Sequence, residues 1–243
     1  MSVKELTDIL RKSNKTVFFG GAGVSTASGI PDFRSAEGLW NQSFGRFITP
    51  EELVSHSYFE KDPETFFAFY KEKLIYPEAR PNACHRALAR LEEMGRLSAV
   101  VTQNIDGLHQ MAGSQVVHEL HGSVHRNFCT RCHAAYPVDY ILNTSGVPRC
   151  KNCGSIVKPD VVLYEEMLDE NVMDRAVRAI RQADCLIVGG TSLIVYPAAG
   201  FIHHYQGDRL VVINKTETQA DEYADLVIHQ DIAAVMEEAV AAL

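Results

Sequence analysis

The sequence predicts an α/β fold in which a doubly wound parallel sheet carries a small inserted module. Short apolar runs of strand length alternate with helix-like segments, which is typical of Rossmann-like parallel sheets. A glycine-rich turn follows the first apolar run, and turns of this kind connect strand to helix where nucleotides bind. Four cysteines lie close together within residues 124–158 and interrupt the alternation.

The individual elements follow from hydrophobic periodicity and from end signals. Residues 3–12 have the pattern of an amphipathic helix, and Thr16-Val-Phe-Phe19 is an apolar run expected to form a buried strand. A second helix begins with Asp62 as its N-cap and Pro63 as its first residue, and a third, at 84–94, stops at Gly95. Other strands are expected at 98–103, 116–120, 161–164, 185–189, 210–214 and 226–229, and other helices at 172–182, 197–204 and 231–242.

The turn after the first strand is the strongest single indication of function. Its glycines let the backbone approach a ligand, and the hydroxyls that follow are expected to cap a helix whose free amides attract phosphate. These residues are Gly20, Gly21, Gly23, Ser25, Thr26 and Ser28. The G-x-G-x-x-G fingerprint is incomplete because Thr26 stands at its third glycine, and no acid ends a strand about twenty residues on. The glycines alone leave both a bound nucleotide and a ligand-free turn open.

Composition limits the class of protein. The chain has 243 residues, 46% of them hydrophobic, and we expect one main domain at 1–123 and 159–243 with a module at 124–158. A net charge of −8 gives no overall basic footprint for nucleic acid. The N-terminal segment lacks the apolar core of a signal peptide, and no apolar run approaches the roughly 20 residues of a membrane span. We therefore expect a cytoplasmic protein.

Two C-x-x-C pairs predict a structural zinc site. The pairs are Cys129 with Cys132 and Cys150 with Cys153, and residues 133–149 between them match the spacer of about 15–20 residues in zinc modules. Four thiolates complete a tetrahedron and leave no open position, so we expect the ion to hold the fold and to do no chemistry. Two disulfides are the alternative, which a reducing cytoplasm disfavours.

Polar residues follow four of the expected strands. Since ligands bind beyond the carboxyl ends of parallel strands, these residues are expected to converge on one crevice. They are Thr102-Gln-Asn-Ile-Asp-Gly-Leu-His109, His121-Gly122, Gly189-Gly-Thr-Ser192 and Asn214. His121 is the best candidate for a general base, because the pKa of histidine suits proton transfer near neutrality. A metal site formed by His118, His121 and His125 would need a helix, which the β-branched pattern and Gly122 disfavour.

Taken together, these segments resemble the sirtuin family of NAD-dependent protein deacylases, most closely its bacterial members. The motifs are Gly21-Ala-Gly-Val-Ser25, Gly29-Ile-Pro-Asp-Phe-Arg34, Thr102-Gln-Asn-Ile-Asp106, His121-Gly122, the four cysteines, Gly190-Thr-Ser-Leu193 and Val195-Tyr-Pro-Ala-Ala199. The resemblance implies an NAD-dependent protein lysine deacetylase, which transfers the acetyl group to ADP-ribose and releases nicotinamide and O-acetyl-ADP-ribose. A protein ADP-ribosyltransferase, an NAD hydrolase and a non-enzymatic NAD-sensing or zinc-ribbon module remain alternatives.

The resemblance also assigns roles to residues. His121 would be the general base, and Asn104 would orient the ribose or a water molecule. The residues that would line the NAD site are Ala22, Thr26, Phe33, Arg34, Gln103, Ile105, Asp106, Thr191, Ser192, Asn214 and Ile232. Phe33, Ile105 and Asp106 would surround the nicotinamide ribose and carboxamide. An acyl-lysine peptide would add as a β-strand between residues 161–166 and 193–196.

Two departures from the family pattern concern the substrate. Tyr164-Glu165-Glu166 replaces the usual aromatic, glycine and glutamate, which puts the loop geometry in doubt and is expected to favour basic peptides. Sirtuins that remove succinyl or malonyl groups have a Tyr-x-x-Arg pair, and here Tyr70 is followed by Lys73. Lysine lacks the two-pronged fork that matches a carboxylate. We therefore expect deacetylation first, with succinyl or malonyl removal as the alternative.

Overall fold

A six-stranded parallel sheet forms the centre of the computed structural model, which describes residues 3–33, 38–39 and 48–243. The strand order is β3-β2-β1-β7-β8-β9, and every neighbouring pair is parallel. The strands are β1 (Thr16–Gly20), β2 (Leu97–Thr102), β3 (Val117–Glu119), β7 (Cys185–Gly189), β8 (Leu210–Ile213) and β9 (Leu226–Ile228). β1 and β7 are buried throughout, as expected for apolar strands covered on both faces. The predicted fold class is confirmed.

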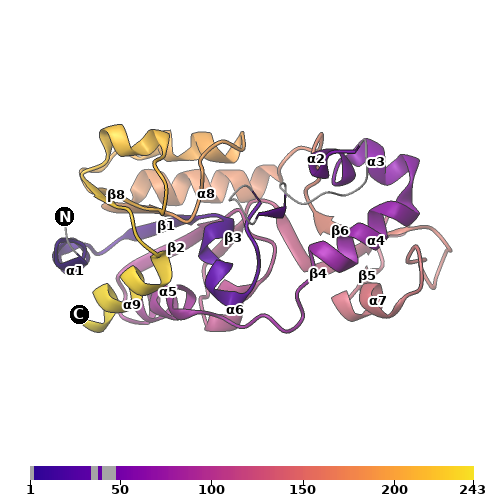
Figure 1. The fold of residues 1–243 in the computed structure, drawn as a ribbon, viewed down its shortest axis with the longest axis horizontal. Helices are drawn as coiled ribbons and strands as arrows, with labels where there is room; N and C mark the ends of the chain where they lie inside the picture. Colours follow the sequence, from indigo (N-terminus) through magenta and orange to yellow (C-terminus); the bar gives the residue numbers. More distant parts are fainter. Residues whose placement is uncertain (1–2, 34–37, 40–47) are drawn as a thin grey trace.

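Helices cover both faces of this sheet (Figure 1). Because successive side chains of a strand point to opposite faces, Phe18 and Phe19 enter two separate hydrophobic cores. The helices on the Phe18 face are α1 (Val3–Lys12), α5 (Ala83–Glu93) and α9 (Ile232–Ala241), and those on the Phe19 face are α8 (Glu170–Gln182) and the 3-10 helix η4 (Ala198–His204). A short helix, α6 (Leu108–Ala112), follows β2.

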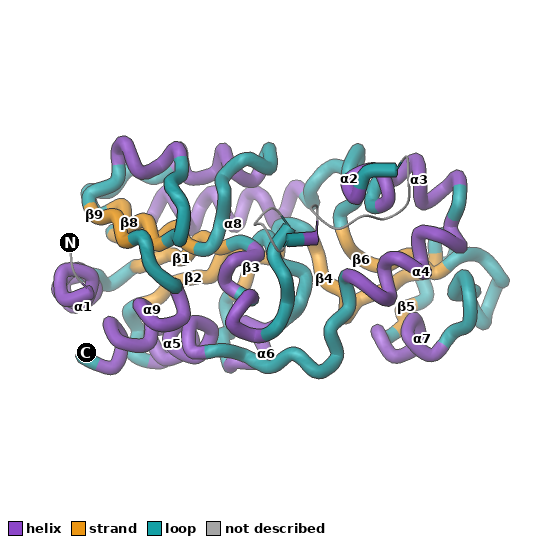
Figure 2. Tube along the Cα trace, in the orientation of Figure 1, coloured by secondary structure: helices purple, strands orange, loops and turns teal. Residues whose placement is uncertain are grey.

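The molecule is elongated, and a smaller, antiparallel sheet lies at the end opposite the parallel sheet (Figures 1 and 2). Its order is β5-β4-β6, with β4 at Gly122–Cys129, β5 at Ala135–Tyr136 and β6 at Val157–Val161. The short helices here are α2 (Pro50–Leu53), α3 (His56–Lys61), α4 (Pro63–Lys73) and α7 (Val138–Asn143). Phe66 and Val124 belong to a third core, which therefore combines residues from α4 and from the smaller sheet. The domain boundaries at 1–123, 124–158 and 159–243 stay a prediction.

Several predicted elements are confirmed at their ends. The Asp62 side chain accepts a hydrogen bond from the Thr65 amide at 3.1 Å, as an N-cap should. α5 ends next to Gly95, which has a left-handed φ of +70°. Among the residues that the structure describes, no helix has the length and apolar character needed to cross a bilayer.

Three expectations are wrong. The strand expected at 161–164 lies instead at Val157–Val161, in the antiparallel sheet, where burial alternates along the strand and the polar Lys158 and Asp160 had hidden it. The segment after the glycine turn forms two 3-10 turns, Ala22–Val24 and Thr26–Ser28, and no α-helix. The Ser25 side chain caps neither turn. The helix expected at 197–204 is present at Ala198–His204, where it is a 3-10 helix.

Candidate active site

The glycine turn after β1 packs directly against the turn after β7. The Gly23 amide donates a hydrogen bond to the Gly190 carbonyl at 2.8 Å. A Cβ atom at Gly23 would lie 2.9 Å from the Gly190 Cα, which is too close for any side chain. Gly190 has a φ of +58°, a left-handed conformation that glycine adopts without strain. The glycines therefore allow the ends of two neighbouring strands to touch.

Beside this contact, three side chains form a hydrogen-bonded chain. The Ser25 hydroxyl donates to Asp106 Oδ2 at 2.6 Å and accepts from Asn104 Nδ2 at 3.0 Å. Burial raises the pKa of Asp106, and the hydrogen bond from Ser25 opposes that rise. The Leu108 amide donates to the other Asp106 oxygen at 2.9 Å. Asn104 and Asp106 are thus held in fixed orientations by contacts within the protein.

His121 is oriented by the loop that follows β2. Its Nδ1 lies 3.0 Å from the Gln103 carbonyl oxygen, and because a carbonyl can only accept, Nδ1 carries the proton. Burial lowers the pKa of His121, while this hydrogen bond raises it in part. The neutral ring therefore has its lone pair on Nε2, which makes no hydrogen bond among the described residues. The Gln103 side chain in turn donates to Thr191 Oγ1 at 3.0 Å.

These contacts join loops that follow four strands of the parallel sheet, β1, β2, β3 and β7. We call the six residues the strand-end site: Ser25, Gln103, Asn104, Asp106, His121 and Thr191. The convergence expected from the sequence is present for these residues, and it places a neutral histidine in the same site as the buried Asn104 amide and the partly buried Asp106 carboxyl. Such a group is suited to proton transfer near neutral pH.

The other residues predicted to line an NAD site mostly follow the carboxyl ends of strands. Those that are partly buried are Ala22, Thr26, Phe33, Ile105 and Asn214. Ser192 is exposed, whereas Ile232 is 5% exposed and belongs to the core beside the sheet. Arg34 lies outside the described residues. The individual roles of these residues toward NAD stay predictions.

The neighbouring histidines are placed differently from His121. His118 lies on the edge strand β3, where burial and nearby Arg175 lower its pKa. His125 is exposed, and its Nε2 lies 3.0 Å from the Asp106 carbonyl. Within the described part of the chain, no metal-binding group of three or more residues includes a histidine. The three-histidine metal site therefore finds no support here.

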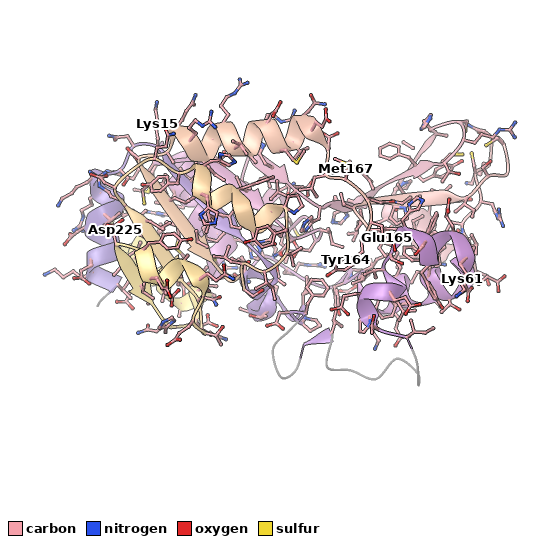
Figure 3. The ribbon with its side chains drawn as sticks, turned by 90° about the horizontal axis from the view of Figure 1, so that it is seen from above. Lys15, Lys61, Tyr164, Glu165, Met167 and Asp225 are labelled. Carbon is pink, nitrogen blue, oxygen red and sulfur yellow. The ribbon has the colours of Figure 1, made fainter. Side chains whose placement is uncertain are left out.

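The predicted substrate loop, residues 161–166, is attached to the start of α3 (Figure 3). Ser55 and Tyr164 form an isolated parallel β-bridge. The Glu165 carboxylate accepts hydrogen bonds from the Ser57 amide and hydroxyl, both at 2.9 Å. Glu166 Oε1 lies 2.8 Å from His56 Nδ1. Glu165 is exposed and both of its hydrogen-bond donors are neutral, so the expected preference for basic peptides stays a prediction.

Tyr70 is part of the third hydrophobic core. Its ring stacks on Phe66 with centroids 5.7 Å apart, and the side chain has no exposed surface. Burial raises the pKa of the Tyr70 hydroxyl, which has no hydrogen-bond partner among the described residues. Lys73 Nζ lies 3.0 Å from Glu72 Oε1. Tyr70 and Lys73 therefore do not form a fork for an acyl carboxylate in this conformation.

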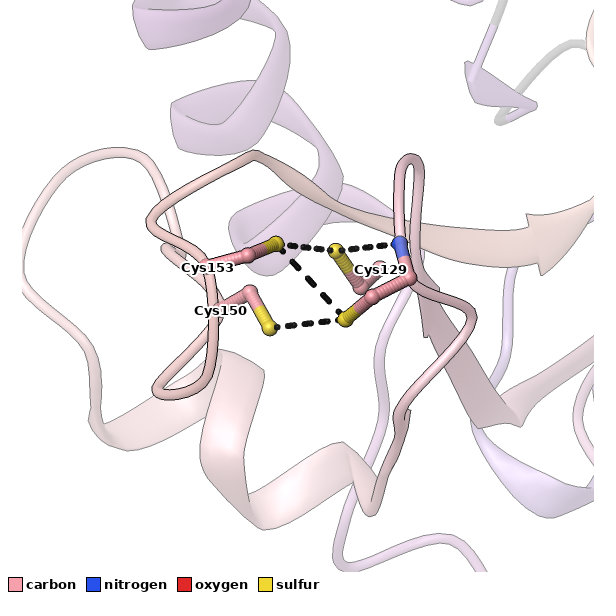
Figure 4. Close-up of side chains that lie close together, drawn as sticks. Cys129, Cys150 and Cys153 are labelled. Carbon is pink, nitrogen blue, oxygen red and sulfur yellow. Dashed lines mark hydrogen bonds between the residues drawn. The ribbon is translucent and has the colours of Figure 1, made fainter.

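The four predicted metal ligands come together in one cluster (Figure 4). Their Sγ atoms all lie within 4.8 Å of one another, with Cys129 and Cys153 at 3.4 Å and no disulfide. A tetrahedral zinc with Zn–S bonds of about 2.3 Å needs S–S separations of about 3.8 Å, which fits this cluster. Backbone amides and the Tyr136 hydroxyl donate to Cys129 and Cys150 Sγ, as thiolates favour. The cluster can hold one structural zinc.

Fold and site together define a Rossmann-like α/β protein with a neutral histidine at the strand ends and a cluster of four cysteines that can hold a metal. The chain belongs to the Sir2 family, which residues 21–197 match. This membership confirms the sirtuin resemblance derived from the motifs.

Individual relatives extend over almost the whole chain. It is 63% identical over 235 residues to an NAD-dependent protein deacetylase of Clostridium perfringens, with 96% of each chain covered. It is 53% identical over 236 residues to one of Clostridium acetobutylicum, covering 97% of this chain and 96% of the relative.

Solved structures of Sir2 proteins have the same fold. A Sir2 complex with a p53 peptide and NAD+ is 40% identical, with a TM-score of 0.87 and coverage of 100% of this chain and 98% of the other. A Sir2 complex with deacetylated p53 peptide and 3′-O-acetyl ADP-ribose is 39% identical, with a TM-score of 0.90 and the same coverage.

Sequence reasoning missed the part that Ser25 plays in this site. We expected a helix cap, whereas its hydroxyl connects Asn104 to Asp106. The signal for this contact is a hydroxyl soon after one buried strand, Ser25, together with an amide and an acid after the neighbouring strand, Asn104 and Asp106. It was overlooked because capping is the commoner role of serine after a glycine turn.

Proposed function

We propose that this chain is an NAD-dependent protein lysine deacetylase that transfers an acetyl group to ADP-ribose and releases nicotinamide. Its relatives from Clostridium are named for this activity, and solved relatives contain NAD+, a p53 peptide or an acetyl ADP-ribose. The observation that carries the proposal is His121, neutral through burial and with Nε2 available to take a proton. We expect the protein to act in the cytoplasm on proteins, without a need for nucleic acid.

The residues of the strand-end site would divide binding, orientation and proton transfer among them. NAD, when bound, supplies the ADP-ribose that accepts the acyl group. When NAD is bound, His121 Nε2 would take the proton from the ribose hydroxyl that receives the acyl group, and the Gln103 carbonyl would stabilise the resulting imidazolium through Nδ1. Asn104, fixed by Ser25, orients a hydroxyl or a water molecule with its amide. Asp106 is held by Ser25 and contributes hydrogen-bonding capacity to the nicotinamide end.

Incubation with NAD and an acetylated peptide, followed by mass spectrometry, tests the proposal. Deacetylated peptide, nicotinamide and O-acetyl-ADP-ribose in equal amounts are the expected products. ADP-ribose attached to the peptide would identify a transferase, and free ADP-ribose with intact acetyl-peptide would identify an NAD hydrolase. No turnover of NAD would favour the non-enzymatic alternative.

We also propose that acetyl is the preferred acyl group. Tyr70 is buried in an aromatic core and Lys73 contacts Glu72, so neither is arranged to bind an acyl carboxylate. On one peptide sequence, kcat/KM for the acetyl form should exceed that for the succinyl form. If the succinyl form is preferred, Lys73 reaches the acyl group, and Lys73→Met should then remove that preference while sparing deacetylation.

A further inference from the structure

Glu165 has an unusual backbone conformation for a residue with a side chain. Its φ is +75°, in the left-handed region, where a Cβ atom crowds the following carbonyl. Glycine adopts this conformation without that strain. Some other interaction must therefore stabilise Glu165 in the conformation observed.

The interaction is a pair of hydrogen bonds to the start of α3. Both carboxylate oxygens of Glu165 are used, one by the Ser57 amide and one by the Ser57 hydroxyl, each at 2.9 Å. Ser57 lies in the first turn of a helix whose N-cap is Ser55, and amides at a helix start favour a carboxylate. Hydrogen bonds to an ionised acceptor are also stronger than neutral ones. The side chain of Glu165 thus holds its own loop against α3.

In the same loop, the backbone groups of one residue are left without a hydrogen-bond partner among the described residues. The Tyr164 amide donates to the Val54 carbonyl and its carbonyl accepts from the His56 amide, both at 3.0 Å. The Leu163 carbonyl accepts from the Glu166 amide at 3.0 Å. Within the described chain, the backbone N–H and C=O of Glu165 make no hydrogen bond. Both groups are therefore available to hydrogen-bond the backbone of an added peptide.

We propose that Glu165 is a positioning residue for the substrate peptide. Its carboxylate, bound to Ser57, fixes the left-handed backbone so that its own N–H and C=O stay available to the backbone of an incoming acyl-lysine peptide. This inference rests on the proposed function, because it assumes that residues 161–166 bind the peptide. The side chain itself does not touch the substrate.

The test compares peptide binding with NAD use in Glu165→Ala, Glu165→Gly and Ser57→Ala. The probe is a fluorescent acetyl-lysine peptide, whose Kd is measured by anisotropy without NAD, alongside kcat and both KM values. Glu165→Ala keeps the left-handed strain without the anchor, so peptide Kd and KM should rise about fivefold to tenfold. The KM for NAD should change by less than about twofold, since the strand-end site is unaltered. Glu165→Gly should bind peptide more tightly than Glu165→Ala, because glycine needs no anchor.

Controls separate a positioning role from a general structural one. Glu238→Ala, which removes an exposed carboxylate from α9, should leave peptide binding unchanged. Ser57→Ala should weaken peptide binding in the native background and have no effect when combined with Glu165→Gly, even if Glu165→Ala fails to fold. Unchanged peptide affinity in Glu165→Ala, or an equal rise in both KM values, overturns the inference. Absent deacetylation by the native chain with normal peptide binding would instead contradict the proposed function.

Discussion

The strand-end site and the cysteine cluster are both built on polar side chains, but they are stabilised in different ways. The strand-end site lies on a sheet with hydrophobic cores on both faces, and its side chains are joined by direct hydrogen bonds such as Ser25 to Asp106. The cysteines lie on turns of a small sheet, where Cys132 is exposed and Cys153 only partly buried. The first site is preformed by the protein, whereas the second needs an ion to join its thiolates.

The largest expected effect tests whether the cysteine cluster needs a metal ion for its stability. Cys150→Ala removes one of four ligands, and structural zinc contributes about 10–16 kcal/mol in isolated zinc-finger peptides. We expect loss of zinc by metal analysis and a lower, broader thermal transition. Asn152→Ala, an exposed neighbour in the same turn, should keep one zinc per chain. A stable, active and zinc-free native chain would contradict the assignment.

The next effect tests whether the strand-end site can lose activity without losing stability. His121→Ala removes the proposed base, and we expect kcat/KM to fall by about 100-fold or more, which corresponds to about 2.7 kcal/mol or more. The thermal midpoint should stay within a few degrees, because the ring is only partly buried. His118→Ala, on the neighbouring strand, should change kcat/KM much less. Near-native turnover in His121→Ala would remove His121 from the mechanism.

Most of the sheet was predictable because every parallel strand except the edge strand β3 contains an apolar run. The errors fell where that signal is weak. β6 contains the polar residues Lys158 and Asp160 and pairs in the smaller sheet. The predicted strand was therefore placed on the apolar run that begins at Val161, where β6 ends. The turns after β1 are 3-10 because the glycines allow tight packing against Gly190, which propensity alone does not reveal.

The candidate site was predictable as a set of residues but not as a set of contacts. Motif spacing placed Asn104, Asp106 and His121 on neighbouring strand ends, and the four cysteines were identified from spacing alone. The proton is assigned to His121 Nδ1 because this nitrogen contacts the backbone carbonyl of Gln103. A contact to the backbone cannot be inferred from a motif of side chains. The anchor between Glu165 and Ser57 joins distant segments, so it required the fold.

A smaller effect tests whether hydrogen bonds alone hold the strand-end site. Ser25→Ala leaves Asn104 Nδ2 without its acceptor and Asp106 Oδ2 without its donor, while Oδ1 keeps the Leu108 amide. An unsatisfied buried group costs about 1–3 kcal/mol, and we expect a loss of unfolding free energy in that range by denaturant titration. In Ser25→Ala combined with Asp106→Asn, the two losses should be less than additive, since the residues share one interaction. Full additivity would show that the contact contributes nothing.

The smallest expected effect concerns the ion pair between His56 and Glu166, beside the substrate loop. The hydrogen bond that His56 donates to the Glu166 carboxylate is the main cause that raises the pKa of His56 above 6.5. Burial raises the pKa of Glu166, but its hydrogen bond with His56 and the charge of Lys158 outweigh this and lower it below 4.5.

These two directions set the pH window of the pair. The His56 contribution is complete below about pH 6.5 and is lost as pH rises through its raised folded pKa. The Glu166 contribution is complete above about pH 4.5 and is lost as pH falls through its lowered folded pKa. The difference in unfolding free energy between the native chain and His56→Gln should therefore be largest between pH 4.5 and 6.5. Because the His56 side chain is 43% exposed, solvent screens the pair, and the difference should stay below about 1 kcal/mol. Thermal unfolding of both chains from pH 4 to 9 measures it, and a difference that grows above pH 7 would exclude this ion pair as its source.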